Sequence, residues 1–322
     1  MTDLSVIIPI FNEACCLQSF HARLGRVVDQ LGMRAELIYV NDGSTDNTQH
    51  VLDDIASKDQ RVLVLELSRN FGHQAALSAG LASADGNVIV MLDGDGQHPP
   101  ELIPEMIKLQ SLGYDIVQCQ RVEDKNSASL MKRITARLFY SLLSNMGEID
   151  LAPGSADFRL ITAEVLAQLR SLPEYHRFIR GMISWIGFRS ILLPYRADNR
   201  INGASKYSIR KMLRLAADGM FSFSLMPLRL GFLIGTTFLL LALSECIYIA
   251  WTWMSGNQRE LVPGWSSTIV LLTFSSGSIM VLLGFIGIYV GMIFQQVKHR
   301  PIFIVRDRSA KVGRGREAVA NK

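Results

Sequence analysis

An apolar run that ends in two carboxylates constrains the fold of this chain most. Residues 86–90 resemble a short buried strand, and residues 91–100 (MLDGDGQHPP) follow it with Asp93 and Asp95 on either side of one glycine. Carboxylates at the carboxyl end of a buried strand cost free energy unless a cation or ligand meets them, and open α/β sheets bind ligands at that end. The pattern therefore indicates a site for Mg²⁺ or Mn²⁺ that holds a diphosphate, with a solvated turn as the alternative.

The residues before this turn alternate between predicted strands and predicted helices. We expect strands at 4–10, 35–40, 61–67 and 87–92, and helices that run to about residue 31, from 46 to 57 and from 71 to 84. This alternation predicts an α/β fold with a mostly parallel sheet and helices on both faces. A nicotinamide-binding Rossmann domain is disfavoured because the first strand-to-helix turn, residues 9–13, contains no glycine.

Acidic residues follow three of these strands. Glu13 comes after the first, Asp42 after the second, and Asp93 with Asp95 after the fourth. Since the carboxyl ends of parallel strands meet at one end of a sheet, we expect these acids to line one crevice. Taken singly, Glu13 or Asp42 could instead cap a helix, and Ser44, Thr45 or Asp46 is expected to cap the helix at 46–57.

Further elements follow the acidic turn. We expect a helix at 101–112, a strand at 116–119 that ends at Arg121, and a helix at 162–171. Just before the last of these, Asp157 either pairs with Arg159 or caps the helix. Residues 129–145 form an amphipathic pattern that fits either a helix on the sheet or one in a membrane interface.

Basic residues are common in the segment that precedes the apolar C-terminal region. Residues 195–207 are rich in arginine and lysine, and 208–225 read as a second amphipathic basic helix. Such charges form either a solvated face or a binding surface for phosphate and lipid headgroups.

Two long apolar runs, 230–254 and 265–294, are each long enough to cross about 30 Å of hydrocarbon. Basic residues precede the first run and follow the second, whereas the charges of the connecting loop, Arg259 and Glu260, cancel. The positive-inside rule then places the body and both termini in the cytoplasm of an integral membrane protein. We thus expect a catalytic domain at 1–228, two transmembrane helices within 229–295 and a basic tail at 296–322, and we leave the role of Glu245 open.

Charge and cysteine usage narrow the class of protein. The net charge of +4 is modest and clusters around the apolar runs, which does not suit a nucleic-acid reader. The four cysteines have no metal-ligand spacing, and because strand-like sequence begins at Leu4 we expect no secretory leader. We therefore expect reduced thiols in a cytosolic body.

Several motifs, in order along the chain, carry a resemblance to a known family. They are VIIPIFNE at 6–13, VNDGSTD at 40–46, SRNFGH at 68–73, MLDGDGQHPP at 91–100 and DFRL at 157–160. With the basic segment at 200–207 and the two C-terminal runs, the chain resembles a family 2 glycosyltransferase of GT-A fold, within the polyprenyl-phosphate glycosyltransferases. That group includes bactoprenol glucosyltransferases, dolichol-phosphate mannose synthases and undecaprenyl-phosphate aminoarabinose transferases. The expected architecture is a GT-A (Rossmann-like) α/β domain with interfacial helices and two transmembrane helices.

The resemblance implies roles for individual residues. The donor nucleotide would contact Pro9, Glu13, Asp42 and Asp93, and the Mg²⁺ or Mn²⁺ ion would be held by Asp93, Asp95 and Gln97. Asp157 would be the catalytic residue near the acceptor, and the plausible phosphate ligands are Arg121, Lys132, Arg133, Arg200 and Lys206.

The resemblance also implies a reaction. We expect inverting transfer of one hexose, with glucose from UDP-glucose as the first choice, to undecaprenyl phosphate at the cytoplasmic membrane face by a homo-oligomer. Mannose, an N-acetylhexosamine or a formamido-aminoarabinose remains open as the sugar, and a non-catalytic nucleotide-sugar-binding membrane scaffold is the alternative from another class. Because a phosphate monoester loses its second proton with a pKa of about 6, Asp157 would either take a residual proton or position the attacking oxygen.

Overall fold

The computed structural model describes residues 2–122, 155–175, 177–196 and 264–309, together with part of residues 231–255. Outside the described residues lie the expected helices at 129–145 and 208–225, and Lys132, Arg133, Arg200, Lys206 and Glu245. The chain divides into two compact units, Met1–Gly219 with Arg300–Lys322, and Met220–His299.

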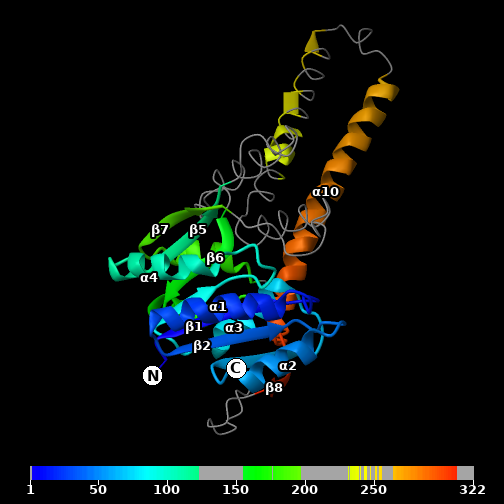
Figure 1. The fold of residues 1–322 in the computed structure, drawn as a ribbon. Helices are drawn as coiled ribbons and strands as arrows, with labels where there is room; N and C mark the ends of the chain where they lie inside the picture. The colour runs from blue at the N-terminus through cyan, green and yellow to red at the C-terminus, as the bar shows by residue number, and fades with distance from the viewer. Residues whose placement is uncertain are drawn as a thin grey trace. The chain divides into compact units, whose positions relative to one another are not determined.

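An eight-stranded mixed sheet forms the centre of the first unit (Figure 1). Its strands in spatial order are β7 (Ser190–Tyr195), β5 (Ile116–Arg121), β6 (Ser155–Thr162), β4 (Val88–Met91), β1 (Leu4–Ile10), β2 (Ala35–Asn41), β3 (Val62–Leu67) and β8 (Val305–Ser309). The four strands β4-β1-β2-β3 are parallel, and β7 is parallel to β5, whereas β6 runs antiparallel to β4 and β5, and β8 runs antiparallel to β3. The expected mostly parallel α/β sheet is confirmed, and the sequence analysis did not predict β6, β7 or β8.

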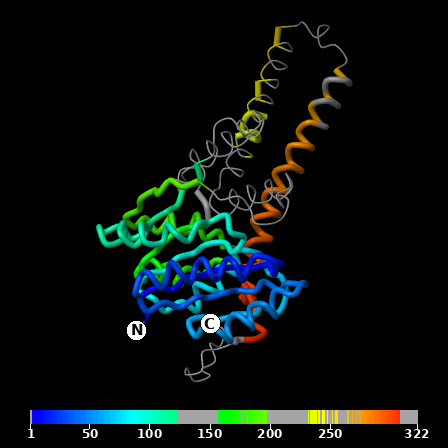
Figure 2. The backbone as a smooth tube through the Cα atoms, in the orientation of Figure 1, coloured from blue at the N-terminus to red at the C-terminus, as the bar shows by residue number. Residues whose placement is uncertain are grey.

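Helices cover both faces of this sheet. On one face α1 (Leu17–Leu31) contacts α2 (Thr48–Lys58) and α4 (Ile103–Ser111), which follows the short 3₁₀ turn η1 (Pro100–Leu102). On the other face α3 (His73–Ser83) contacts α6 (Ala163–Ser171), and α6 contacts α7 (Ile179–Ile186). Figure 2 traces the same backbone as a tube, from blue at the N-terminus through green for residues 155–196. Every residue of β1 and β2 is buried, as in a parallel sheet covered on both sides.

A proline is tolerated in the central strand β1 because of where β4 ends. The β1–β4 pairing stops at Ile7 and Met91, whereas the β1–β2 pairing continues through Pro9 and Val40 to the end of β1. At Pro9 the strand therefore resembles an edge strand in the described sheet, which is where proline interrupts least hydrogen bonding. The shorter β4 leaves its carboxyl end open beside the last residues of β1.

The second unit contains the long helix α10 (Trp265–Val297), which ends three residues beyond the expected 265–294. Within it, Phe274–Val297 is long and apolar enough to cross a membrane, with a mean hydropathy of 2.2. The residues described between 231 and 254 are helical and pack antiparallel to α10, since the Phe238 ring lies 5.0 Å from that of Phe274 and Gly231 lies against Leu282. Too few residues of the expected span at 230–254 are described to test it as a membrane crossing.

Candidate active site at the carboxyl end of the sheet

The acids expected from the sequence follow strands that finish at the same end of the sheet. We call this end, where β1 to β4 finish, the carboxyl end. The strand order reverses between β1 and β4, because β2 and β3 lie on one side of β1 and β4 lies on the other. Such a reversal is where open α/β sheets bind ligands.

An antiparallel strand brings Asp157 to the same place. Arg159 of β6 pairs with Met91, the last residue of β4, so Asp157 lies just beyond the carboxyl end of β4. Since β6 is also antiparallel to β5, with Ser155 opposite Gln120, Arg121 finishes β5 at this end of the sheet. Burial raises the pKa of the Tyr195 hydroxyl. The charges of Arg121, Asp93 and Asp95 also influence this pKa.

The Asp-x-Asp turn after β4 is shaped by its own backbone. The Gln97 amide donates to Asp95 Oδ1 at 3.0 Å, and the Asp93 amide donates to His98 Nδ1 at 2.9 Å. A Cβ atom at Gly94 would collide with the end of the Ile10 side chain, so a larger residue between the two acids would require Ile10 to move. The Asp93 side chain remains 34% exposed.

The oxygen atoms of this turn suit a hard divalent cation that arrives with phosphate. Among the residues that the structure describes, no three His, Cys, Asp or Glu side chains form a group that could hold a metal ion by itself. Mg²⁺ in nucleotide sites needs only one or two carboxylates, because substrate phosphates and water complete its shell. The donor set of Asp93, Asp95 and Gln97 therefore fits a metal bound together with a diphosphate.

Glu13 lies beside the Asp-x-Asp turn. The Cys16 thiol lies 3.5 Å from Glu13 Oε2 and 3.5 Å from the Gly94 carbonyl oxygen, which places Glu13 close to Gly94. Burial and the neighbouring Glu13 carboxylate raise the pKa of the Cys16 thiol to about 12. This arrangement agrees with the expected convergence of the first and fourth strand ends.

Asp42 is buried and holds the loop at 68–72. Its two carboxylate oxygens accept the amides of Phe71 at 2.8 Å and Gly72 at 2.9 Å, so it binds the residues that precede α3. Burial raises the pKa of Asp42, and these two hydrogen bonds act in the opposite direction. The residue that precedes α2 is Asn47, which makes no side-chain cap hydrogen bond, whereas Asp46 Oδ1 accepts the amide of Thr48, the first residue of α2, at 3.0 Å. A direct contact of Asp42 with a nucleotide stays a prediction.

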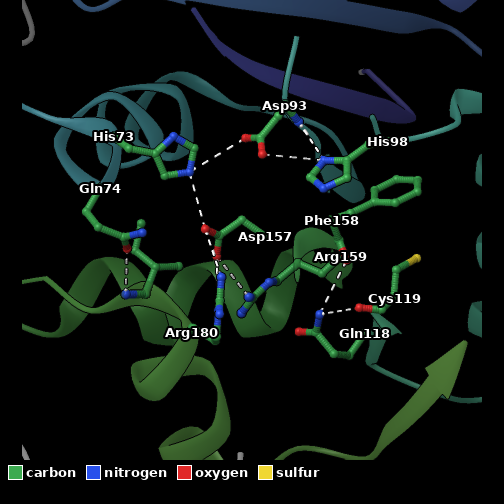
Figure 3. A network of polar contacts seen from close by, with 11 residues as sticks. His73, Gln74, Asp93, His98, Gln118, Cys119, Asp157, Phe158, Arg159 and Arg180 are labelled. Atoms are coloured by element: carbon green, nitrogen blue, oxygen red, sulfur yellow. Dashed lines mark hydrogen bonds and ion pairs between the residues drawn. The ribbon is translucent and has the colours of Figure 1, made fainter. Parts of the chain in front are cut away.

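Three cationic side chains surround Asp157 (Figure 3). Arg159 lies 3.2 Å from Oδ1, and Arg180 and His73 lie 3.1 and 3.3 Å from Oδ2. We call these four residues the Asp157 group. The pair with Arg159 is one of the two alternatives that the sequence left open, and the other is not seen, because α6 begins six residues after Asp157.

The charge state of Asp157 follows from these neighbours. Burial alone would raise the pKa of Asp157, but Arg180, His73 and Arg159 outweigh it and hold the pKa well below its ordinary value. A carboxylate with so low a pKa is a weak proton acceptor at neutral pH. Arg159 is only 1% exposed, and burial lowers its pKa to about 10, so it remains charged and depends on Asp157 as its partner.

His73 lies between the Asp-x-Asp turn and the Asp157 group. Its Nε2 atom lies 3.3 Å from Asp157 Oδ2 and 3.7 Å from Asp93 Oδ1. Burial would lower the pKa of His73, but the carboxylates of Asp93 and Asp157 raise it to about 9. One imidazolium thus links the acid expected to bind the donor with the acid expected to face the acceptor.

Three residues of the site, His73, His98 and Arg180, were not expected from the sequence. His98 is buried, accepts the Asp93 amide and stacks on Phe158, with the ring centroids 5.2 Å apart. His73 and His98 both lie inside the motifs that carry the family resemblance, so those motifs contained a signal for them. Arg180 had no such signal, because it belongs to α7, which the sequence pattern did not predict.

Comparison with known proteins identifies the family. The sequence model of glycosyl transferase family 2 matches residues 5–170 of this chain. The uncharacterized glycosyltransferase YkcC of Bacillus subtilis is 40% identical over 303 residues, which are 94% of this chain and 93% of that protein. The bactoprenol glucosyl transferase of Shigella phage SfV is 33% identical over 312 residues, which are 96% of this chain and 99% of that protein. The chain belongs to glycosyl transferase family 2.

Solved structures show weaker similarity. Mannosyl-3-phosphoglycerate synthase from Rubrobacter xylanophilus superposes with a TM-score of 0.48 at 16% identity, covering 67% of this chain and 71% of that chain.

Proposed function

We propose that this glycosyltransferase moves a single hexose from a nucleotide sugar to a polyprenyl phosphate. The observation that carries the proposal is the link through His73 between the Asp-x-Asp turn and the Asp157 group. The site therefore contains an acid pair suited to a metal ion with a diphosphate. Beside this pair it contains the cation-rich Asp157 group, which is suited to a second phosphate. Similarity to proteins named bactoprenol glucosyl transferases over nearly the whole chain supports a lipid-linked acceptor, undecaprenyl phosphate, and glucose from UDP-glucose as the first choice of donor.

Each predicted residue takes a role in this proposal. Pro9, Glu13, Asp42 and Asp93 bind the donor nucleotide, and Asp93, Asp95 and Gln97 hold Mg²⁺ or Mn²⁺ with the diphosphate. The metal, when bound, neutralises the negative charge of the departing nucleoside diphosphate. The acceptor phosphate is bound by Arg121 and, in segments that the structure does not describe, by Lys132, Arg133, Arg200 and Lys206.

Asp157 acts in this proposal chiefly by orientation. The acceptor phosphate is already largely ionised near neutral pH, because its second pKa is about 6. A carboxylate whose pKa is held low by Arg180, His73 and Arg159 is better suited to fixing those cations than to removing a proton. The phosphate oxygen then attacks the sugar C1 in line with the leaving diphosphate, which inverts the anomeric centre.

The test of this function is lipid-linked product formation. Membranes that contain the full chain are incubated with undecaprenyl phosphate and, in parallel, with radiolabelled UDP-glucose, GDP-mannose and UDP-N-acetylglucosamine, with and without EDTA. We expect one donor to give a lipid-extractable product, and EDTA to abolish it. Absence of product with every donor would contradict transfer of these three sugars to undecaprenyl phosphate, and full activity in EDTA would contradict the metal.

We further propose that residues 230–254 and 265–294 both cross the membrane, with the catalytic domain and both termini in the cytoplasm and the chain in a homo-oligomer. In a variant without native cysteines, Asn257→Cys should react with an impermeant thiol reagent from outside, and Gly313→Cys only after the membrane is opened. Reaction of both positions from one side would contradict two crossings.

A further inference from the structure

A hydrogen bond joins the two helices, α3 and α7, that carry two of the three cations around Asp157. Gln74, the second residue of α3, accepts the backbone amide of Ile179 through Oε1 at 3.0 Å (Figure 3). Ile179 is the first residue of α7 and is buried. The first amides of a helix have no acceptor inside the helix, and Phe178, which precedes α7, provides no side-chain cap. Gln74 therefore supplies that acceptor from another helix.

The residues next to this bond both contact Asp157. Arg180 follows Ile179, its Nε donates to Asp157 Oδ1 at 3.3 Å, and its Nη2 lies 3.1 Å from Oδ2. His73 precedes Gln74 and lies 3.3 Å from the same Oδ2. The Gln74 bond thus fixes the spacing between the two backbone segments that bring an imidazole and a guanidinium to one carboxylate oxygen.

We propose that Gln74 is a positioning residue that acts through Arg180, by holding the start of α7 where the guanidinium faces Asp157 with two nitrogens. A two-nitrogen contact depends on direction as well as distance, so a small shift of the helix start weakens it. Displacement of a reacting or orienting group by about 1 Å can cost up to about 10²-fold in rate. The inference rests on the proposed function, because the rate concerned is that of sugar transfer.

The test compares three variants of the full chain. Gln74→Met keeps the length and helix propensity of the side chain but removes the acceptor oxygen, and Gln74→Glu keeps an acceptor at the same reach. Gln168→Met is the matched control, because Gln168 is exposed on α6. We expect Gln74→Met to lower kcat by about 10-fold with nucleotide-sugar affinity within about twofold of wild type, Gln74→Glu to recover most of the rate, and Gln168→Met to match wild type. If the transfer rate of Gln74→Met falls only in proportion to the amount of folded protein, Gln74 has a structural role instead.

A double-mutant cycle asks whether Gln74 acts through Arg180. If it does, adding Gln74→Met to Arg180→Met should slow transfer no further, because the group that Gln74 positions is already gone. If the rate losses of the two single variants multiply in the double variant, the inference is overturned.

Hydrogen exchange supplies a readout that needs no acceptor lipid. Peptides that cover residues 177–183 should exchange faster in Gln74→Met than in wild type or Gln168→Met, and unchanged exchange would overturn the assigned bond. If wild type transfers no sugar to undecaprenyl phosphate, the proposed function fails, whereas the exchange result still decides whether Gln74 holds α7.

Discussion

The Asp-x-Asp turn and the Asp157 group lie next to each other but hold their carboxylates in opposite ways. Asp93 is 34% exposed, and the imidazoles of His73 and His98 lie 3.7 Å from its oxygens. Asp157 is 14% exposed and has two guanidinium groups and an imidazole within 3.3 Å. The turn therefore offers negative charge to an incoming cation, whereas the Asp157 charge is already balanced by the protein.

The two regions also differ in how they are built. The turn comes from ten consecutive residues, shaped by hydrogen bonds from its backbone amides to its own side chains and by the close approach of Gly94 to Ile10. The Asp157 group comes from β6, α3 and α7 and depends on how these elements pack. Substitution of the exposed acids of the turn should consequently affect chemistry alone, whereas substitution in the Asp157 group should affect chemistry together with stability.

The largest expected effect on rate is at the turn. Asp95→Asn keeps the Oδ1 atom that accepts the Gln97 amide but removes the charge, so transfer should fall by about 10²- to 10³-fold while Tm stays near that of wild type. Initial rates across a Mg²⁺ and Mn²⁺ titration measure this effect. Asp54→Asn, a surface carboxylate paired with Lys58, is the control and should leave the rate unchanged. Wild-type activity of Asp95→Asn would remove the metal assignment.

Asp157→Asn should lower both rate and stability. We expect kcat to fall by about 10²-fold with nucleotide-sugar affinity close to wild type, because an orienting interaction is lost. The buried Arg159 then loses the negative charge that faces it, which should cost about 3–5 kcal/mol of unfolding free energy. Calorimetric titration with UDP-sugar and metal, and thermal unfolding, measure the two effects. Donor binding weakened as severely as in Asp42→Asn would place Asp157 in the nucleotide site instead.

The pH dependence of Asp157 provides a related check. Its pKa in the folded protein lies below the unfolded value of about 3.9, so its contribution to stability is complete above pH 4 and is lost as pH falls through the folded pKa. Between pH 6 and 8 the wild-type rate should accordingly show no inflection from Asp157. If the rate of Asp157→Asn instead recovers in part as pH rises, Asp157 removes the residual proton of the acceptor phosphate.

A smaller effect is expected where the two regions meet at His98. His98→Phe keeps the stack on Phe158 but leaves the Asp93 amide without its acceptor, which should cost about 1–3 kcal/mol of stability. Because the amide fixes the start of the turn, we also expect transfer to slow by about 10-fold with metal dependence shifted to higher concentration. His50→Phe, on the outer side of α2, serves as the control. An unchanged metal titration would show that His98 supports packing alone.

The smallest effect is expected at the far side of the sheet. Arg306 of β8 lies 3.3 Å from Glu66 of β3, with its side chain 71% exposed, and such surface pairs contribute about 0–1 kcal/mol. Arg306→Gln should therefore leave transfer unchanged and shift Tm by no more than a few degrees. A large loss of activity would show that β8 influences the carboxyl end of the sheet.

Local pattern in the sequence determined the parallel part of the fold and the acids at its carboxyl end. Strand and helix periodicity, and the turn residues between them, are set by neighbours along the chain, and the structure confirms β1 to β5 with α1 to α4 within a few residues of their expected bounds. The same applies to α10, whose apolar length alone predicts a helix able to cross a membrane.

Only the tertiary structure decided how the antiparallel strands complete the site. β6 (SADFRLIT) does not read as a buried strand because it contains Arg159, which is buried beside β4 with its charge facing the Asp157 carboxylate. The strand β8 (VRDRS) is equally charged, and it joins the sheet by pairing with β3, more than 230 residues earlier in the chain. The contacts of Asp157 with His73 and Arg180 depend on strand direction and helix packing, which act between distant segments and leave no periodic mark in the sequence.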